Sequence, residues 1–477
     1  MTRSSFFSPI LLSLFLASVI LLSPPVAASQ QPVADFSISP GNSSLDVTLA
    51  DTSDGPHSGW FWSFGDGAFS YGRAPAHTYA GPGSYAISLI ISDTAGHASI
   101  KKRFVAFRPV RPAYPWLAFQ DFFFKPAPPT TFRETEDHLI MQENTENLST
   151  LHDSLVRPLT QEHVPPGHTV TFRQSGLPPG LNWSVILVEG NGSRFAKNSS
   201  AAAISFPGIT GPCSYSVPLV VFGKKHVNIS AIPPFGVIDA GTNTVDVRFT
   251  HIEPSWAGYV AAEDVAERQP NVTSVRGSWR IPDLSGNPPE MATVFQWIGI
   301  GGFFPGDSHN LIQTGTASCI GGLCPVQYNY GWTELLPDNS EPIPWDFRVL
   351  PGDVMQAEIH EDSPGRWNVS LADLTQDWHY RKTVFYNSSR DSAEWILEKP
   401  TYAGEIHDLA GFVGAGFGTG TLSTGGNDAT IGPVTGPAGS FPGFSVTMVR
   451  DNTSRAIPSN LSPEGGFTVH GFSGNGG

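Results

Sequence analysis

The feature that most constrains the fold is the regular interruption of short apolar runs by glycine and proline. The chain has 50 Gly and 42 Pro among its 477 residues, and they separate runs such as SYAISLIISD, NWSVILVE and GFSVTMVRD. Runs of this length, rich in β-branched and aromatic residues and bounded by turn residues, are typical of antiparallel strands. Only the polar stretch 133–160 departs from this pattern, and it could form a helix or a disordered connector. We therefore predict an all-β protein.

The first 29 residues have the order of a secretory signal peptide. Arg3 precedes the apolar run FFSPILLSLFLASVILL, and small residues follow in VAAS. The alternative is an uncleaved anchor, but the small residues directly after the run favour cleavage. No later segment is long and apolar enough to span a bilayer. The sequence thus predicts a secreted, extracellular protein with no stable membrane span after signal removal.

Size and charge limit the domain count and the partners. The roughly 450 residues after the signal are too many for one core, so two to four domains are expected. The formal net charge of −15 argues against nucleic acid as a partner. Charged residues make up only 14% of the chain, which fits an acidic habitat.

The three cysteines cannot all pair with one another. Cys319 and Cys324 flank IGGL and could close a small disulfide loop, which would leave Cys213 over. The chain has no CxxC pair and no zinc-ligand spacing, so we predict neither a metal nor a cofactor. Candidate glycan sites occur at Asn42, Asn147, Asn182, Asn191, Asn198, Asn228, Asn271, Asn368, Asn387, Asn452 and Asn460.

Two segments before the C-terminal region resemble known β-modules. Residues 32–107 contain WFWSFGDG, in which Gly65-Asp66-Gly67 predicts a tight hairpin, followed by HTYAGPGSY. This segment resembles a PKD domain, an immunoglobulin-like sandwich, which implies a spacer or adhesion role with cell-surface contact. Residues 166–251 resemble a small β-sandwich module of exported proteins from acid-living archaea. We expect residues 108–165 to be a linker or a prosegment.

Residues 252–477 carry a different set of motifs. Six motifs follow one another along this region: SWAGYV, VRGSWRIP, FQWIGIGG, NLIQTG, YNYGWTELLPD and SAEWILEKP. Their order and spacing resemble the glutamic peptidases, the eqolisin or G1 family, from residue 252 to about residue 430. The resemblance implies a concanavalin-like or jelly-roll sandwich of two antiparallel sheets, with a catalytic pair and a substrate cleft on the concave sheet.

Five residues match functional positions of that family. The resemblance assigns the catalytic pair to Gln313 in IQTG and to Glu394 in AEWI. It implies a substrate-binding role for Trp297, Trp332 and Glu334. Other hydrolase signals, such as GxSxG and HExxH, are missing.

Three positions depart from the family pattern. Gly301 and Ala317 stand where the family often has acidic residues, and Leu335 begins a segment that is usually rich in tyrosine. These changes put the substrate preference in doubt.

The chemistry of the pair can be argued without the family. A carboxylate can take a proton from water and return it to the leaving nitrogen, while an amide can donate a hydrogen bond to the oxyanion. Glutamine cannot ionise, so it stays a donor in acid. We expect hydrogen bonds to keep Glu394 partly ionised there. Alternation along strands would place Glu394 and Glu398 on one face and Trp395 on the other, and Gln313 opposite Ile312.

Two hypotheses follow. The first is a secreted, acid-acting endopeptidase of the glutamic type that acts on polypeptide substrates. The second is a non-catalytic surface protein whose degenerate peptidase-like sandwich binds glycan or protein, since a fold alone does not fix a function.

Overall fold

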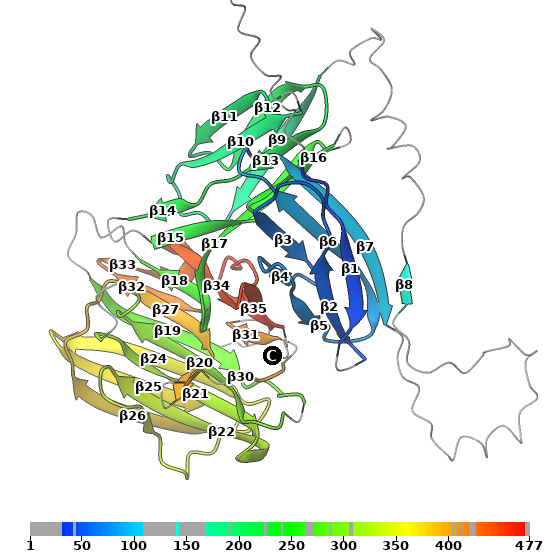
Figure 1. Cartoon of the computed structure of the whole chain (residues 1–477). Helices are drawn as coiled ribbons and strands as arrows, with labels where there is room; N and C mark the ends of the chain where they lie inside the picture. Colours follow the sequence, from blue (N-terminus) through cyan, green and yellow to red (C-terminus); the bar gives the residue numbers. More distant parts are fainter. Residues whose placement is uncertain are drawn as a thin grey trace, which may run out of the picture. The chain divides into compact units, whose positions relative to one another are not determined.

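The computed structural model describes most of the chain as strands (Figure 1). The described residues are 31–41, 44–107, 140–142, 167–190, 192–223, 227–239, 242–262, 271–286, 288–304, 309–402, 405–406, 408–412, 414–418 and 426–472. The predicted signal peptide and most of segment 108–165 lie outside them. The all-β prediction is confirmed, because within these ranges the elements are strands and a single 3₁₀ turn, Ala438–Ser440.

The N-terminal region forms two small sheets around an aromatic core. One sheet contains β1 (Phe36–Pro40), β2 (Asp46–Asp51) and β5 (Ala76–Thr78), and the other contains β3 (Gly59–Ser63), β4 (Phe69–Ser70), β6 (Gly83–Ser92) and β7 (Ala98–Phe107). The predicted hairpin joins β3 to β4, with positive φ at Gly65 and Gly67. Trp62 and Phe64 from this hairpin are fully buried in the core.

One three-residue strand corrects the prediction for 133–160. Ile140–Gln142 form β8, which pairs antiparallel with β7. The expectation of a helix or a disordered connector is therefore wrong for these residues, because the free edge of β7 offers backbone hydrogen bonds that an isolated polar segment lacks. The rest of that stretch lies outside the described residues.

The middle region also consists of strands. They are β9 (His168–Ser175), β10 (Trp183–Glu189), β11 (Arg194–Ser199), β12 (Ala203–Ile209), β13 (Cys213–Ser216), β14 (Val220–Phe222), β15 (Val227–Ile232), β16 (Phe235–Ile238) and β17 (Thr244–Glu253). Cys213 is buried and has no disulfide partner. β17 pairs with β9 and β15, and its end pairs with the C-terminal strand β34. This strand crosses the boundary predicted at residue 251.

The C-terminal region is a sandwich of two sheets. The first sheet has the order β23 (Glu341–Pro342), β22 (Cys324–Leu335), β21 (Ile312–Gly321), β20 (Ala292–Ile300), β27 (Ala393–Glu398), β18 (Trp256–Ala261), β34 (Gly443–Arg450). The second has the order β26 (Trp378–Phe385), β25 (Arg366–Asp373), β24 (Val354–Ser363), β19 (Val272–Arg280), β32 (Asp428–Ile431), β33 (Val434–Pro437).

Short strands complete this region. They are β28 (Thr401–Tyr402), β29 (Glu405–Ile406), β30 (Asp408–Leu409), β31 (Ala415–Phe417), β35 (Thr453–Pro458) and β36 (Phe467–Gly471). β31 pairs with both β19 and β36, and β35 pairs with both β34 and β36, so these strands link the two sheets at one end.

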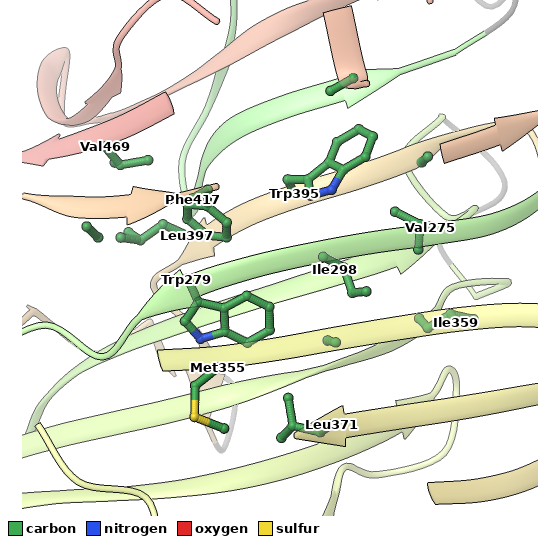
Figure 2. Close-up of a cluster of buried hydrophobic side chains, with 14 of the residues drawn as sticks. Val275, Trp279, Ile298, Met355, Ile359, Leu371, Trp395, Leu397, Phe417 and Val469 are labelled. Carbon is green, nitrogen blue, oxygen red and sulfur yellow. The ribbon is translucent and has the colours of Figure 1, made fainter. Parts of the chain in front are cut away.

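The core between the two sheets is apolar and fully buried. Figure 2 shows side chains from both layers meeting there: Ile298, Trp395 and Leu397 come from the first sheet, and Trp279 and Met355 from the second. Period-two alternation puts every second residue of β27 into this core. The residues between them therefore face the other side of the first sheet, where the candidate site lies.

Candidate active site

The strand register brings the two predicted catalytic residues into one row. Gly299 of β20 lies opposite Glu394 on one side and opposite Gln313 on the other. Gln313 in turn lies opposite Glu334 of β22. Directly opposed residues point to the same face, and neighbouring strands are about 4.8 Å apart. The Cα atoms of Glu394 and Gln313 are thus roughly 10 Å apart, with a residue lacking a side chain between them.

Gly299 lets three side chains pack closely over the backbone between Glu394 and Gln313. A Cβ atom at this position would lie 3.2 Å from Glu394 Oε2 and 2.9 Å from Trp297 Cζ3. It would also lie 2.8 Å from Leu311 Cδ1, which is closer than Cβ atoms normally approach. A larger residue would therefore collide with the side chains that pack between the two strands. Gly299 had no predicted role, although the glycine-rich motif GIGG indicates that the backbone there is closely approached.

Glu394 is a buried carboxyl without a hydrogen-bond partner. Its side chain has 0% exposure, and neither Oε1 nor Oε2 bonds to any described residue. Burial raises the pKa of Glu394 well above its usual value, and the nearby charge of Asp391 adds to this. The Ser392 hydroxyl, which donates to Asp391 Oδ1 at 3.3 Å, lowers this pKa by less than burial raises it. The expectation that hydrogen bonds keep this group ionised is wrong, because desolvation dominates.

Gln313 is oriented by its neighbour in the row. Its Nε2 donates to Glu334 Oε2 at 2.5 Å, and its Oε1 has no partner among the described residues. Burial raises the pKa of Glu334, and the bonds from Gln313 and from the backbone at Ser340 oppose that shift. The bond to Glu334 fixes which end of the amide is the nitrogen. The second N–H of this nitrogen can donate to another acceptor, because an amide nitrogen carries two donors.

Trp297 and Trp332 lie on the same face as the pair. They occupy the next row, in which Trp297 is opposite Gly315 and Gly315 is opposite Trp332. Both are almost fully buried, at 0% and 2% exposure, outside the core between the sheets. Trp332 Nε1 has no partner among the described residues. Their placement beside the row of Glu394 and Gln313 fits a lining of the cleft.

Glu398 is a residue of this face to which sequence reasoning gave no role. Trp297 Nε1 donates to Glu398 Oε2 at 2.8 Å, and the rings of Trp256 and Trp297 meet edge to face at 5.0 Å. Burial raises the pKa of Glu398 to about 7, against the lowering effect of the indoles of Trp297 and Trp256. Because Trp297 Cζ3 reaches the Gly299 position, Glu398 anchors the ring that borders Glu394.

The departure at Gly301 has a packing reason. Gly301 has φ +79°, and a Cβ there would lie 2.5 Å from Ser389 Oγ and 2.8 Å from Ser388 Oγ. An acidic residue at this position would collide with the loop that leads into β27. Ala317 lies between Phe295 and Tyr330, in the row of Glu398.

The predicted disulfide is present. Cys319 and Cys324 are bonded across the turn between β21 and β22, with their Cα atoms 6.0 Å apart. Within the described ranges, no group of three or more His, Cys, Asp or Glu residues has a metal-binding arrangement. Nor do those ranges contain a helix long and apolar enough to cross a membrane.

Comparisons with known proteins agree with two of the three resemblances. Residues 254–451 match the model of the Peptidase A4 family, and residues 23–106 match the model of the PKD domain. The resemblance inferred for residues 166–251 stays a prediction. No curated protein matches the chain with significance.

Solved structures with similar folds include two glutamic peptidases. Scytalido-glutamic peptidase with a transition state analog inhibitor is 18% identical, with 46% of this chain and 98% of that chain covered and a TM-score of 0.38. Aspergilloglutamic peptidase from Aspergillus niger is 20% identical, with coverages of 38% and 99% and a TM-score of 0.32. The PKD1 domain of a Vibrio cholerae metalloprotease, PrtV, is 31% identical, with coverages of 16% and 94% and a TM-score of 0.15.

These matches assign families to two separate parts of the chain. One match covers the N-terminal strands and the other covers the C-terminal sandwich, with the middle region between them. The chain therefore carries a PKD domain near its N-terminus and, in its C-terminal part, a peptidase domain of the Peptidase A4 or eqolisin family.

Proposed function

We propose that this protein is a secreted, acid-acting endopeptidase of the glutamic type, with Glu394 and Gln313 as its catalytic residues. The observation that carries the proposal is the row formed by Glu394, Gly299 and Gln313. It combines a buried carboxyl without partners, a glycine that leaves no room for a side chain, and an oriented amide. Buried polar groups in native proteins normally have partners, so the exceptions at this site call for a bound water or a substrate.

The row supports attack by water on the scissile carbonyl, followed by breakdown of the tetrahedral intermediate. The ionised Glu394 takes a proton from water as the water oxygen bonds to the scissile carbonyl carbon. Gln313 Nε2 donates a hydrogen bond to the oxyanion that forms on the carbonyl oxygen. Glu394 then returns the proton to the amide nitrogen as the C–N bond breaks, which releases an amine and a carboxylic acid. One side-chain donor to an oxyanion contributes roughly 3–4 kcal/mol to lowering such a barrier.

The raised pKa of Glu394 refines the expected working pH. A general base works best when its pKa lies near the pH of the reaction, because base strength and the ionised fraction then balance. Since burial raises this pKa, we expect activity in weak acid to fall as the pH drops and Glu394 becomes protonated. The Cys319–Cys324 disulfide and the signal-like N-terminus support export to an oxidising compartment.

The first prediction concerns Glu394→Gln, which keeps the shape of the side chain but removes the base. We expect turnover of an acid-denatured protein substrate to fall at least about 1,000-fold, since a catalytic group of this kind supplies several kcal/mol. Fragment release measured between pH 3 and pH 7, with pepstatin present to exclude aspartic peptidases, gives the readout. Glu358→Gln, at an exposed position on β24, is the matched control and should leave activity unchanged.

Two outcomes would count against the proposal. Cleavage by Glu394→Gln at the wild-type rate would remove Glu394 from the mechanism. Absence of cleavage by the wild-type protein at every pH, together with specific binding of a glycan or a protein, would favour the non-catalytic alternative. The site favours the enzyme, because a binding surface gains nothing from a buried carboxyl without partners.

A further inference from the structure

The strand β22 has an open backbone edge close to the candidate site. β21 pairs with β22 from Leu335 to Tyr328 and, after a register shift, again at Cys324, whereas β23 pairs with it only at Trp332 and Thr333. The Gly331 carbonyl accepts a hydrogen bond of 2.8 Å from the outer side. Alternation then turns the backbone groups of Asn329 and Gln327 outward as well. On that side, none of the described strands pairs with them.

The same stretch exposes apolar side chains on the face of the site. Tyr328 is 57% exposed and Val326 is 74% exposed. The rings of Tyr328 and Tyr330 lie 5.9 Å apart, and Tyr330 is followed on this face by Trp332. Native proteins usually protect an edge strand with charges, because an open apolar edge invites another chain to pair with it. This stretch carries no charged residue between Cys324 and Trp332.

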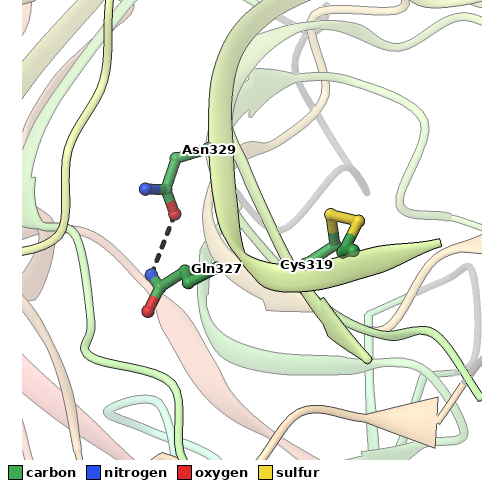
Figure 3. The surroundings of a disulfide bond; sticks show 4 residues. Cys319, Gln327 and Asn329 are labelled. Carbon is green, nitrogen blue, oxygen red and sulfur yellow. Dashed lines mark hydrogen bonds between the residues drawn. A yellow bond between two sulfur atoms is a disulfide. The ribbon is translucent and has the colours of Figure 1, made fainter. Parts of the chain in front are cut away.

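Several contacts hold this edge rigid. The disulfide joins the start of β22 to β21. The Gln327 side chain accepts from the Leu284 backbone N–H and donates to the Pro282 carbonyl, both at 2.8 Å, and also donates to Asn329 Oδ1 at 2.9 Å (Figure 3). The side chains of Gln327 and Asn329 alternate with those of Val326 and Tyr328 and therefore lie on the opposite face. A strand fixed in this way loses little entropy when another strand binds to it.

We infer that the outer edge of β22, from Val326 to Tyr330, is a docking strand for an extended, apolar-rich segment of the polypeptide substrate. The segment adds to the sheet as one more strand, with main-chain hydrogen bonds to Gln327 and Asn329 and side-chain contacts to Val326 and Tyr328. The occupant is the substrate because the same strand reaches Glu334, beside Gln313, past the two residues that β23 covers. The inference rests on the proposed function for the identity of its ligand.

The register sets the length of chain that must reach this edge. Tyr328 lies six residues along β22 from Glu334, which is about 20 Å at 3.3–3.4 Å per residue. A substrate held at the row of Gln313 therefore needs roughly six further residues on one side to reach Tyr328. Short peptides occupy the catalytic row alone, and longer ones gain the docking contacts.

A binding experiment tests this without depending on turnover. The probes are two fluorescent peptides of the same alternating valine and threonine sequence with lysine ends, about six and about fourteen residues long, so that only the longer one spans the distance. Anisotropy titrations use full-length protein carrying Glu394→Gln. We expect the longer peptide to bind about tenfold more tightly, as burial of two apolar side chains and new main-chain bonds would give.

The docking variant is Val326→Ser with Tyr328→Ser, which should bring the affinities of the two peptides together. The matched control is Phe385→Ser, since Phe385 is 81% exposed on β26, an edge strand of the other sheet. It should keep the tenfold difference. Circular dichroism melting should show that both variants fold like the parent, because the changed side chains are exposed.

The outcomes are distinct. A length advantage that survives in the double variant, or that Phe385→Ser also removes, overturns the inference. A concentration-dependent dimer that the double variant abolishes assigns the edge to a second copy of the chain and also overturns it. Length-dependent binding without any cleavage by the wild-type protein would support the docking strand and contradict only the proposed peptidase activity.

Discussion

The two faces of the first C-terminal sheet are built from alternate residues of the same strands, yet they differ in chemistry. On the core face, Trp395 Nε1 donates to the Arg276 carbonyl and Trp279 Nε1 of the facing sheet donates to Thr316 Oγ1, both at 2.8 Å. On the site face, Trp332 Nε1 and the carboxyl of Glu394 lack partners among the described residues. Burial is nearly complete on both faces. Gln296 Nε2 on the core face also lacks a partner within the described ranges, so the buried carboxyl without a partner, and not exposure, distinguishes the functional face.

Two residues of β27, Leu397 on the core face and Glu394 on the site face, test this difference most directly. Leu397 is fully buried in the core, so Leu397→Ala should lower the free energy of unfolding by about 2–5 kcal/mol through lost burial and a residual cavity. Peptidase activity per folded molecule should persist. Glu394→Gln should do the reverse, with activity lost and the melting temperature unchanged or higher, because it removes a buried ionisable group. Denaturant unfolding together with fragment release measures both. Equal losses of stability in the two variants would contradict the distinction between the faces.

Gly299→Ala tests the close packing between the catalytic residues. The added methyl would meet Leu311, Trp297 and Glu394 at 2.8–3.2 Å. Overpacking of this kind typically costs about 1–3 kcal/mol, and a small displacement of catalytic groups can cost about 100-fold in rate. We expect kcat/KM to fall by about 100-fold with a modest loss of stability. Gly352→Ala, at a glycine with open space around it, is a control for stability, although its φ of +83° adds some backbone strain. Full activity in Gly299→Ala would show that activity does not need this close packing.

The pH dependence of stability gives the smallest expected effect. Burial raises the pKa of Glu398 to about 7 and that of Asp373 to about 6. In the unfolded chain these groups ionise near their ordinary values of about 4, so the folded protein binds extra protons between these limits. The free energy of unfolding should therefore rise as the pH falls from about 7 to about 4.

Glu398→Gln sharpens this test. It should flatten the upper part of the slope, between about pH 7 and pH 6, while Glu358→Gln at the exposed position on β24 should not. Thermal unfolding at a series of pH values measures both variants. The same slope in Glu398→Gln and in the parent would mean that Glu398 ionises normally in the folded protein.

Much of the C-terminal fold was predictable from local patterns. The turn residues and the runs rich in β-branched and aromatic residues predict the strands. Alternation in AEWILE predicts that Trp395 lies on the opposite face from Glu394 and Glu398. The cysteine spacing announced the loop that the disulfide closes. The same reasoning missed β8, because its pairing with β7 is a contact between distant segments and leaves no local period.

The predictions failed where the environment of a side chain mattered. Nothing in the residues around Glu394 shows that its carboxyl loses all its solvent and gains no hydrogen bond, so the expected direction of its pKa shift was wrong. The anchoring of Trp297 by Glu398 also escaped notice, because the two residues lie on different strands.

The sequence by itself determined that the chain forms strands, which residues of each strand share a face, and which two words carry an amide and a carboxyl suited to hydrolysis. Only the tertiary structure decided that Gln313 and Glu394 lie in one row across Gly299, and that both side chains are buried from solvent. The physical reason is that alternation is a property of the local backbone, whereas register and desolvation depend on which strands become neighbours.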